Sequence, residues 1–166
     1  AQAWGDNANL YTLRNVHDMR VQICDIGASL VSWYAPDRAG RMADILLGCT
    51  DAAAYQQHNP AYFGVQVGRW ANRIRDGRFE WDRRDVRLPA NFPPEPHSLH
   101  GLGWQAPWSV TREAGFKCSL GHSHDGGGGW PWAYDAEQRV RLGSQGCAIT
   151  LDVTNLATEP RRHRLS

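Results

Sequence analysis

The stretch that decides the fold is GRWANRIRDGRFEWDRRDVRL, residues 68–88. In its second half, Phe79 and Trp81 alternate with polar residues, and so do Val86 and Leu88 beyond a short charged run. An alternation with a period of two places the apolar side chains on one face of a strand. The segment therefore predicts a strand, a turn and a second strand, whose apolar faces need partners elsewhere in the chain.

The same alternation recurs on both sides of this hairpin, in short runs separated by turn residues. One strand is expected to stop at Pro36, a turn follows with Gly40 at its tip, and a buried strand is expected after that turn. The segments predicted as strands are residues 10–15, 19–27, 28–36, 43–49, 108–114, 132–142 and 147–156. The best helix candidate is DAAAYQQH, residues 51–58, with Asp51 as its N-cap.

Two segments are expected to be loops. LPANFPPEPH, residues 88–97, is rich in proline, and HSHDGGGGWPW, residues 122–132, contains four consecutive glycines. Many short strands with turn signals between them, and no alternation with long helices, predict an all-β fold, either a sandwich or a barrel.

Length and charge limit the domain organisation and the class of partner. The chain has 166 residues, the size of one ordinary domain, and its 18 basic and 17 acidic residues give a net charge of +1. So balanced a charge provides no field that would attract nucleic acid or an anionic membrane surface. No apolar run approaches the roughly 20 residues that span a bilayer. We therefore expect neither a nucleic-acid partner nor a membrane partner. No signal peptide is visible, so we expect a cytoplasmic protein.

The cysteines give no sign of a metal or redox site. Cys24, Cys49, Cys118 and Cys147 are far apart and form no CxxC pair, which argues against zinc and against a redox motif. Cys24 and Cys49 lie in apolar runs, where buried free thiols are common. We expect no metal and no cofactor.

The order of several motifs carries a family resemblance. GRWANRI at residues 68–74 is followed by GRFEWDRRDVRL, then by HSLHG at residues 97–101, by WPW at residues 130–132 and by LDVTN at residues 151–155. This order and spacing resemble the N-terminal part of the aldose 1-epimerase, or galactose mutarotase, family. The resemblance implies an all-β fold of the galactose mutarotase-like supersandwich type, apparently truncated here.

The resemblance also implies an activity and a set of site residues. Mutarotation opens a hexose ring and closes it with the other configuration at C1. This reaction needs a general acid, a general base, and hydrogen-bonding groups that hold the hydroxyls of the sugar in place. Asn72 and Arg73 match the sugar-binding pair of the family. His100 matches its first active-site histidine, and is the candidate catalytic and substrate-binding residue. Arg69 is expected to be structural, and the alternatives for Arg73 and His100 are a solvated arginine and a loop histidine.

Other histidines are assigned no role. His97 stands where the family often has asparagine, and we expect a loop residue. His122, His124 and Asp125 could suggest a metal cluster, but next to four glycines we expect a mobile polar loop, since strong metal sites take their ligands from rigid elements.

In the family, the chain continues for about as much sequence again. The general-acid histidine lies just beyond the equivalent of LDVTN, in a segment resembling MPAGLGFHPYF, and the general-base glutamate lies much later. Here the chain reads TNLATEPRRHRLS, and His163 does not occupy the matching position. We therefore divide the chain into residues 1–160, the N-terminal part of a mutarotase-like β-sandwich domain, and residues 161–166, an aberrant tail. Codons for the tail, shifted by one base, can encode the family segment, so a frameshift after Pro160 is our hypothesis.

Three functions remain open from the sequence. The first is an aldose 1-epimerase that acts on a monosaccharide, of which this chain alone would be inactive and prone to self-association. The second is a non-catalytic carbohydrate-binding protein on the same scaffold. The third is a generic β-sandwich interaction domain, which leaves the order of the motifs unexplained.

Overall fold

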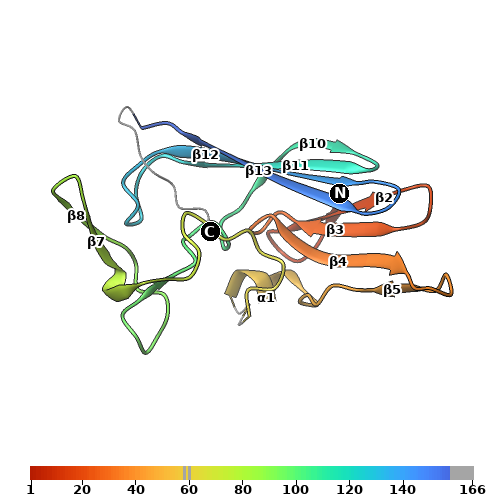
Figure 1. The fold of residues 1–166 in the computed structure, drawn as a ribbon, viewed down its shortest axis with the longest axis horizontal. Helices are drawn as coiled ribbons and strands as arrows, with labels where there is room; N and C mark the ends of the chain where they lie inside the picture. The colour runs from red at the N-terminus through yellow and green to blue at the C-terminus, as the bar shows by residue number, and fades with distance from the viewer. Residues whose placement is uncertain (58, 60, 158–166) are drawn as a thin grey trace.

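The computed structural model describes residues 1–57, 59 and 61–157. Two antiparallel sheets lie face to face and form a β-sandwich, with strands β10–β13 in one layer and β1–β5 in the other (Figure 1). The all-β prediction and the choice of a sandwich are confirmed. The predicted tail, residues 161–166, lies outside the described residues.

Each large sheet follows the order of the chain, because every strand pairs with its neighbour in sequence. The first sheet consists of β1 Gln2–Ala3, β2 Asn9–Arg14, β3 Arg20–Cys24, β4 Ser29–Pro36 and β5 Met42–Asp44. The second consists of β10 Ser109–Ala114, β11 Lys117–His124, β12 Tyr134–Leu142 and β13 Cys147–Asn155. Two small sheets pair β6 Arg73–Ile74 with β9 Ser98–Leu99, and β7 Arg78–Trp81 with β8 Arg84–Arg87. The helices are α1 Ala52–Gln57 and the 3₁₀ turn η1 Arg75–Gly77.

The core lies between the two large sheets and follows from the alternation in their strands. Leu13, Val21 and Ile23 from the first sheet belong to the same buried cluster as Leu120 and Val140 from the second. All five side chains are almost completely buried. Since each fully buried aliphatic side chain contributes roughly 1.5–3 kcal/mol, this cluster supplies much of the stability of the sandwich.

A second cluster seats helix α1 against the first sheet. The carboxylate of Asp51 accepts a hydrogen bond from the backbone N–H of Ala54 at 2.9 Å, so the predicted N-cap is confirmed. Tyr55, on the buried side of the helix, has no exposed surface, and its hydroxyl accepts a hydrogen bond from the backbone N–H of Cys49 at 3.1 Å.

Two predictions of local structure were wrong. The segment 43–49 is no buried strand: β5 ends at Asp44, and Leu47 is 70% exposed. The physical reason is that the carboxylate of Asp44 accepts hydrogen bonds from the backbone N–H groups of Trp33 and Leu46, so a side chain rather than a continuing strand pairs with these groups. The second error concerns residues 122–124, which belong to strand β11 rather than to the glycine loop.

The predicted hairpin of residues 77–88 is present as β7 and β8, and it projects at one end of the sandwich (Figure 1). Its apolar face packs against the aromatic residues that follow the glycine loop. Phe79 lies 6.2 Å from Trp130 and 6.3 Å from Trp132, between ring centroids. Trp70 joins the same group at 5.7 Å from Trp130. The hairpin and this aromatic group anchor the loops that carry the candidate site.

Candidate functional site

The site residues are brought together by the pairing of β6 with β9. Arg73 lies opposite Leu99 in this two-residue ladder, so Asn72 and His100 flank the same end of it. Next to them, Gly68 and Gly101 form a bridge between the two segments. Gly101 has a φ of +70°, and a Cβ on it would lie 2.0 Å from the carbonyl oxygen of Gly68, so the LHG motif needs glycine here.

Asn72, Arg73 and His100 form one hydrogen-bonded network. The backbone N–H of Asn72 donates to Nδ1 of His100 at 3.0 Å, and the backbone N–H of His100 donates to the carbonyl oxygen of Asn72 at 3.1 Å. The guanidinium of Arg73 donates to the side-chain oxygen of Asn72 at 2.9 Å. Asn72 and His100 both have left-handed backbones, with φ of +64° and +60°. Non-glycine residues with a left-handed backbone are uncommon and occur preferentially at functional sites. The backbone conformation of Asn72 and His100 therefore costs free energy.

The network fixes the protonation of His100. Because Nδ1 accepts the hydrogen bond from Asn72, the proton of the neutral ring lies on Nε2. Burial lowers the pKa of His100 below its ordinary value, and the positive charge of Arg73 lowers it further. At neutral pH the ring is therefore neutral and offers Nε2–H as a hydrogen-bond donor.

Three residues that sequence reasoning missed support this network. Tyr62 meets the ring of His100 edge-on at 4.5 Å between centroids, and the guanidinium of Arg73 lies 4.5 Å from the ring centroid of Phe92. Asn91 binds the backbone of Leu99 twice, donating to its carbonyl at 2.9 Å and accepting from its N–H at 2.6 Å. Asn91 thereby acts as a substitute strand partner for β9. Its position in a proline-rich loop gave no periodic signal that could have revealed this.

The remaining sequence candidates have structural contacts. Arg69 is 5% exposed, and its guanidinium lies 4.1 Å from the ring centroid of Tyr134. His97 lies just before β9, outside any strand, and its Nδ1 accepts a hydrogen bond from the backbone N–H of Asp76 at 3.2 Å. His97 thus stabilises the η1 turn.

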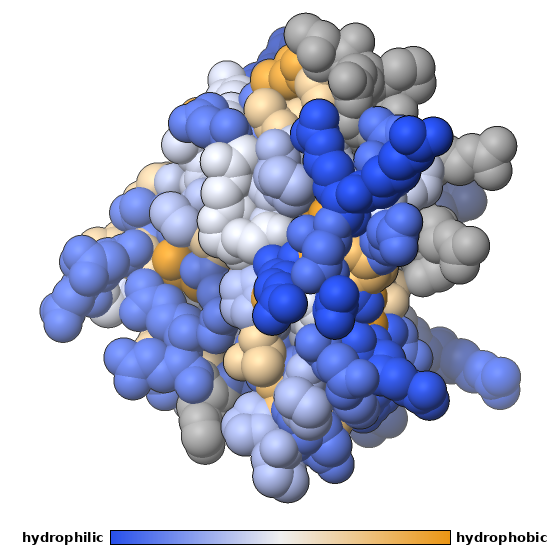
Figure 2. Space-filling view, turned by 90° about the vertical axis from the view of Figure 1, so that its left-hand side faces the viewer, coloured by the Kyte–Doolittle hydropathy of each residue, from blue (hydrophilic) through white to orange (hydrophobic). Residues whose placement is uncertain are grey.

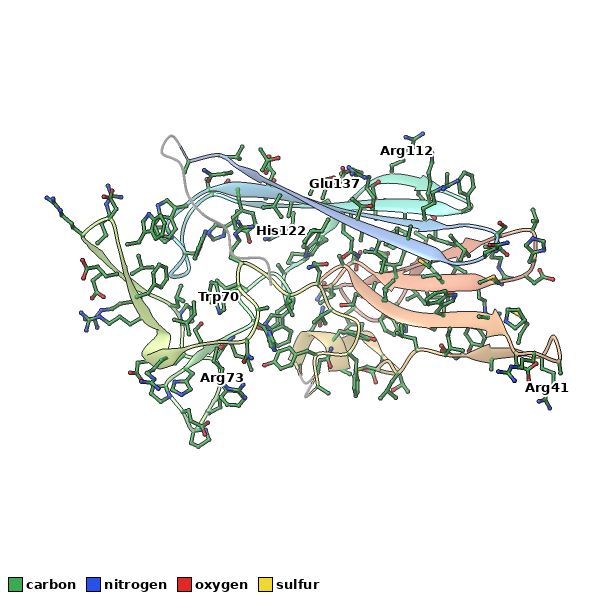
Figure 3. All side chains as sticks on the ribbon, in the orientation of Figure 1. Arg41, Trp70, Arg73, Arg112, His122 and Glu137 are labelled. Carbon is green, nitrogen blue, oxygen red and sulfur yellow. The ribbon has the colours of Figure 1, made fainter. Side chains whose placement is uncertain are left out.

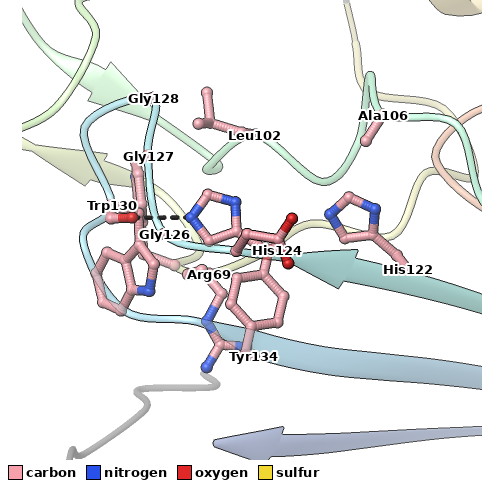
Figure 4. Close-up of a pocket in the computed structure, with 12 residues that line it drawn as sticks. Arg69, Leu102, Ala106, His122, His124, Gly126, Gly127, Gly128, Trp130 and Tyr134 are labelled. Carbon is pink, nitrogen blue, oxygen red and sulfur yellow. Dashed lines mark hydrogen bonds between the residues drawn. The ribbon is translucent and has the colours of Figure 1, made fainter. Parts of the chain in front are cut away.

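His122 and His124 line a pocket of about 370 Å³ together with Arg69 and the glycine loop (Figure 4). They lie on strand β11, so the prediction of a mobile loop was wrong for both. The physical reason is that β11 pairs with β12 as far as His124, which lies opposite Tyr134. In the described part of the chain, no group of three or more His, Cys, Asp or Glu side chains is arranged to hold a metal.

The cysteines show no activated thiol. Burial raises the pKa of Cys24 and that of Cys118 to about 11, so both remain protonated at neutral pH. All four cysteines are free.

The end of the molecule that carries the hairpin presents a mostly hydrophilic surface (Figure 2). Arg73 and His122 lie on different sides of Trp70 in the side-chain view (Figure 3). None of the three network residues lines the pocket at His122, so the network and the pocket are formed by different residues.

The sequence model of the family described as aldose 1-epimerase matches residues 9–161. The chain belongs to this family. The aldose 1-epimerase of Escherichia coli K12 is 34% identical over 145 residues, which cover 83% of this chain and 40% of that protein. The aldose 1-epimerase of Haemophilus influenzae is 38% identical over 80% of this chain and 38% of its own length. The rat galactose mutarotase is 42% identical over 50% of this chain and 23% of its own length.

Solved structures agree with the fold of the sandwich. An aldose epimerase homologue from C. elegans superposes with a TM-score of 0.80 at 23% identity, over 89% of this chain and 46% of that chain. A putative aldose 1-epimerase from E. coli K12 superposes with a TM-score of 0.73 at 21% identity, over 91% of this chain and 47% of that chain. The chain thus spans less than half the length of these relatives. Within its described residues, no helix is long and apolar enough to cross a membrane.

Proposed function

We propose that Asn72, Arg73 and His100 bind the hydroxyl groups of a hexose, as part of an aldose 1-epimerase that interconverts the α and β anomers. The observation that carries this proposal is the hydrogen-bonded network in which the Arg73 guanidinium donates to the side chain of Asn72, and the backbone N–H of Asn72 donates to the ring of His100. It presents planar donors in fixed directions, which is what recognition of several hydroxyls on one ring requires.

Each member of the network has a defined role toward the sugar. Arg73 offers the N–H groups of its guanidinium that Asn72 does not occupy. The amide nitrogen of Asn72 can donate, because its oxygen already accepts from Arg73. His100 donates from Nε2 and acts as an orienting group rather than as a base, since its Nδ1 is engaged by the backbone.

Ring opening needs more than hydrogen bonds to the hydroxyl groups of the sugar. One group must take the proton of the C1 hydroxyl and another must protonate the ring oxygen, and each such transfer contributes about 10²- to 10⁴-fold in rate. The resemblance places both groups in sequence that follows LDVTN. We therefore expect the 166-residue chain to bind hexoses without accelerating mutarotation. Polarimetry on glucose and galactose checks this, and a rate above that of buffer that His100→Ala abolishes would contradict it.

Binding is tested by titrating the chain with galactose and following backbone amide shifts by NMR. Loss of a charge-assisted hydrogen bond corresponds to roughly 1.5–3 kcal/mol, so Arg73→Ala should weaken binding by about one to two orders of magnitude. Arg75→Ala is the matched control, because Arg75 is an exposed arginine two positions further along the chain. Equal affinity of the two variants would remove Arg73 from the site.

A further inference from the structure

The pocket described above, here called the Arg69 pocket, has the composition of a small-molecule site. Its walls include the rings of Trp130 and Tyr134, and its polar residues include Arg69, His124 and Asp125. A volume of about 370 Å³ lies at the lower end of the roughly 300–1,000 Å³ typical of ligand pockets, which suits one small ring rather than an extended ligand. None of the residues Asn72, Arg73 and His100 lines it.

The two histidines of the pocket are held rigidly. His122 stacks on Trp108 with 5.3 Å between ring centroids, and His124 stacks on Tyr134 at 5.1 Å. Both project from strand β11, toward the pocket drawn in Figure 4. A site built on a strand with stacked side chains keeps its geometry before the ligand arrives, which reduces the entropy lost on binding.

The pocket is lined by both hydrogen-bond acceptors and hydrogen-bond donors. Nε2 of His124 lies 2.8 Å from the carbonyl oxygen of Trp130. A carbonyl can only accept, so Nε2 carries a proton, and in the neutral ring Nδ1 of His124 is an acceptor. The carboxylate of Asp125 adds further acceptors. On the donor side, Arg69 lines the pocket with its guanidinium, and the buried indole N–H of Trp130 has no hydrogen-bond partner among the described residues.

The charges of the pocket balance. Arg69 contributes one positive charge and Asp125 one negative charge. His122 adds none at neutral pH, because burial lowers its pKa, and so does the proximity of His124. A neutral ligand with several hydroxyls suits this mixture better than an anion or a cation does, since hydroxyls can both donate to His124 and Asp125 and accept from Arg69.

We propose that the Arg69 pocket is a second sugar-binding site, which takes a single neutral pyranose between aromatic walls and His124 and Asp125. This inference goes beyond the proposed epimerase function, because it concerns residues that the mutarotation site does not use. The pyranose need not be a reducing sugar, since nothing in the pocket has to act on C1.

The test is an NMR titration of the chain with methyl β-D-galactopyranoside, which cannot open its ring. The indole N–H resonance of Trp130, identified from its loss in Trp130→Phe, should shift and saturate. His124→Ala should weaken binding about 3- to 10-fold, the effect of one lost hydrogen bond. Because His124 also bonds to the backbone, Asp125→Ala provides a second variant at an exposed position, with a similar expected effect.

Two controls separate this site from the one at Arg73. Ser123→Ala changes the neighbouring residue of β11, which is exposed and bonds to Asp135 instead, and should leave the affinity unchanged. Arg73→Ala should also leave the Trp130 shift unchanged, while about 10- to 100-fold more galactose is needed to produce the shifts around His100. The inference is overturned if Trp130 does not respond, if neither His124→Ala nor Asp125→Ala weakens the response, or if acetate or phosphate produces the shift and the glycoside does not.

Discussion

The sandwich and the end of the molecule that carries the candidate site are built in different ways. In the sandwich, long strands pair with their neighbours in sequence, and apolar side chains from both sheets fill one core. At the site, the strands β6 and β9 have two residues each, and side chains such as Asn91 replace a neighbouring strand. The contrast teaches that stability and site geometry rest on different residues, so that substitutions should affect one and largely leave the other unchanged.

The largest effect is expected in the sandwich core. Leu120 has no exposed surface, so Leu120→Ala should lower the free energy of unfolding by about 2–5 kcal/mol, through lost apolar contact and a residual cavity. Ile149 is 48% exposed on β13, and Ile149→Ala should lower it far less. Urea unfolding followed by circular dichroism measures both. Similar losses for the two variants would show that the core does not lie between the sheets as described.

An intermediate effect is expected at Asn91, which belongs to the site region but acts on the backbone. Asn91→Ala leaves the N–H and the carbonyl of Leu99 without their side-chain partner, and unpaired buried groups cost about 1–3 kcal/mol. Because His100 follows Leu99 directly, galactose binding should weaken as well. Asn91→Asp keeps the acceptor for the N–H and loses the donor, so its effect should lie between those of Asn91 and Asn91→Ala. If galactose affinity stays constant across this series, Asn91 does not position His100.

How much of this could be read from the sequence depends on the kind of interaction. The alternation of residues 77–88 predicted the hairpin, and Asp51 predicted the start of α1, because both are local patterns. Segment 43–49 was predicted wrongly because an apolar run does not reveal whether its strand lies at the edge of a sheet. His122 and His124 were predicted wrongly because β11 extends to the glycine loop only through its pairing with β12. The partners of His100 come from segments 28 or more residues away, and no local pattern encodes such contacts.

The smallest effect is expected from pH. Burial and Arg73 lower the pKa of His100, and burial and His124 lower that of His122, so the folded chain binds fewer protons than the unfolded chain in mildly acidic solution. The free energy of unfolding should therefore be highest above the ordinary histidine pKa of about 6.5. As the pH falls from there toward the lowered values, it should decrease by at most about 1.4 kcal/mol per pH unit for each group.

Unfolding measured at a series of pH values, for the wild type and for His100→Gln, checks this dependence. In the variant, the free energy of unfolding should decrease less between neutral and mildly acidic pH than it does in the wild type. Hydrogen bonds from Arg41 and Arg78 lower the pKa values of Asp37 and Asp85, respectively. These two carboxylates change the free energy of unfolding only in more acidic solution, outside the range in which the histidines titrate. An identical pH profile for the variant would mean that the ring of His100 is not held neutral by its surroundings.

The most direct test of the sugar site is the ¹⁵N NMR spectrum of the His100 ring at neutral pH, without and with galactose. The hydrogen bond from Asn72 to Nδ1 predicts a neutral ring with its proton on Nε2. Galactose should change the Nε2 resonance in a saturable way and leave Nδ1 bound to the backbone, and Arg73→Ala should need about 10- to 100-fold more galactose for the same change. A ring protonated on Nδ1, or an Nε2 resonance that galactose does not change, would contradict the proposal that Asn72, Arg73 and His100 bind the sugar.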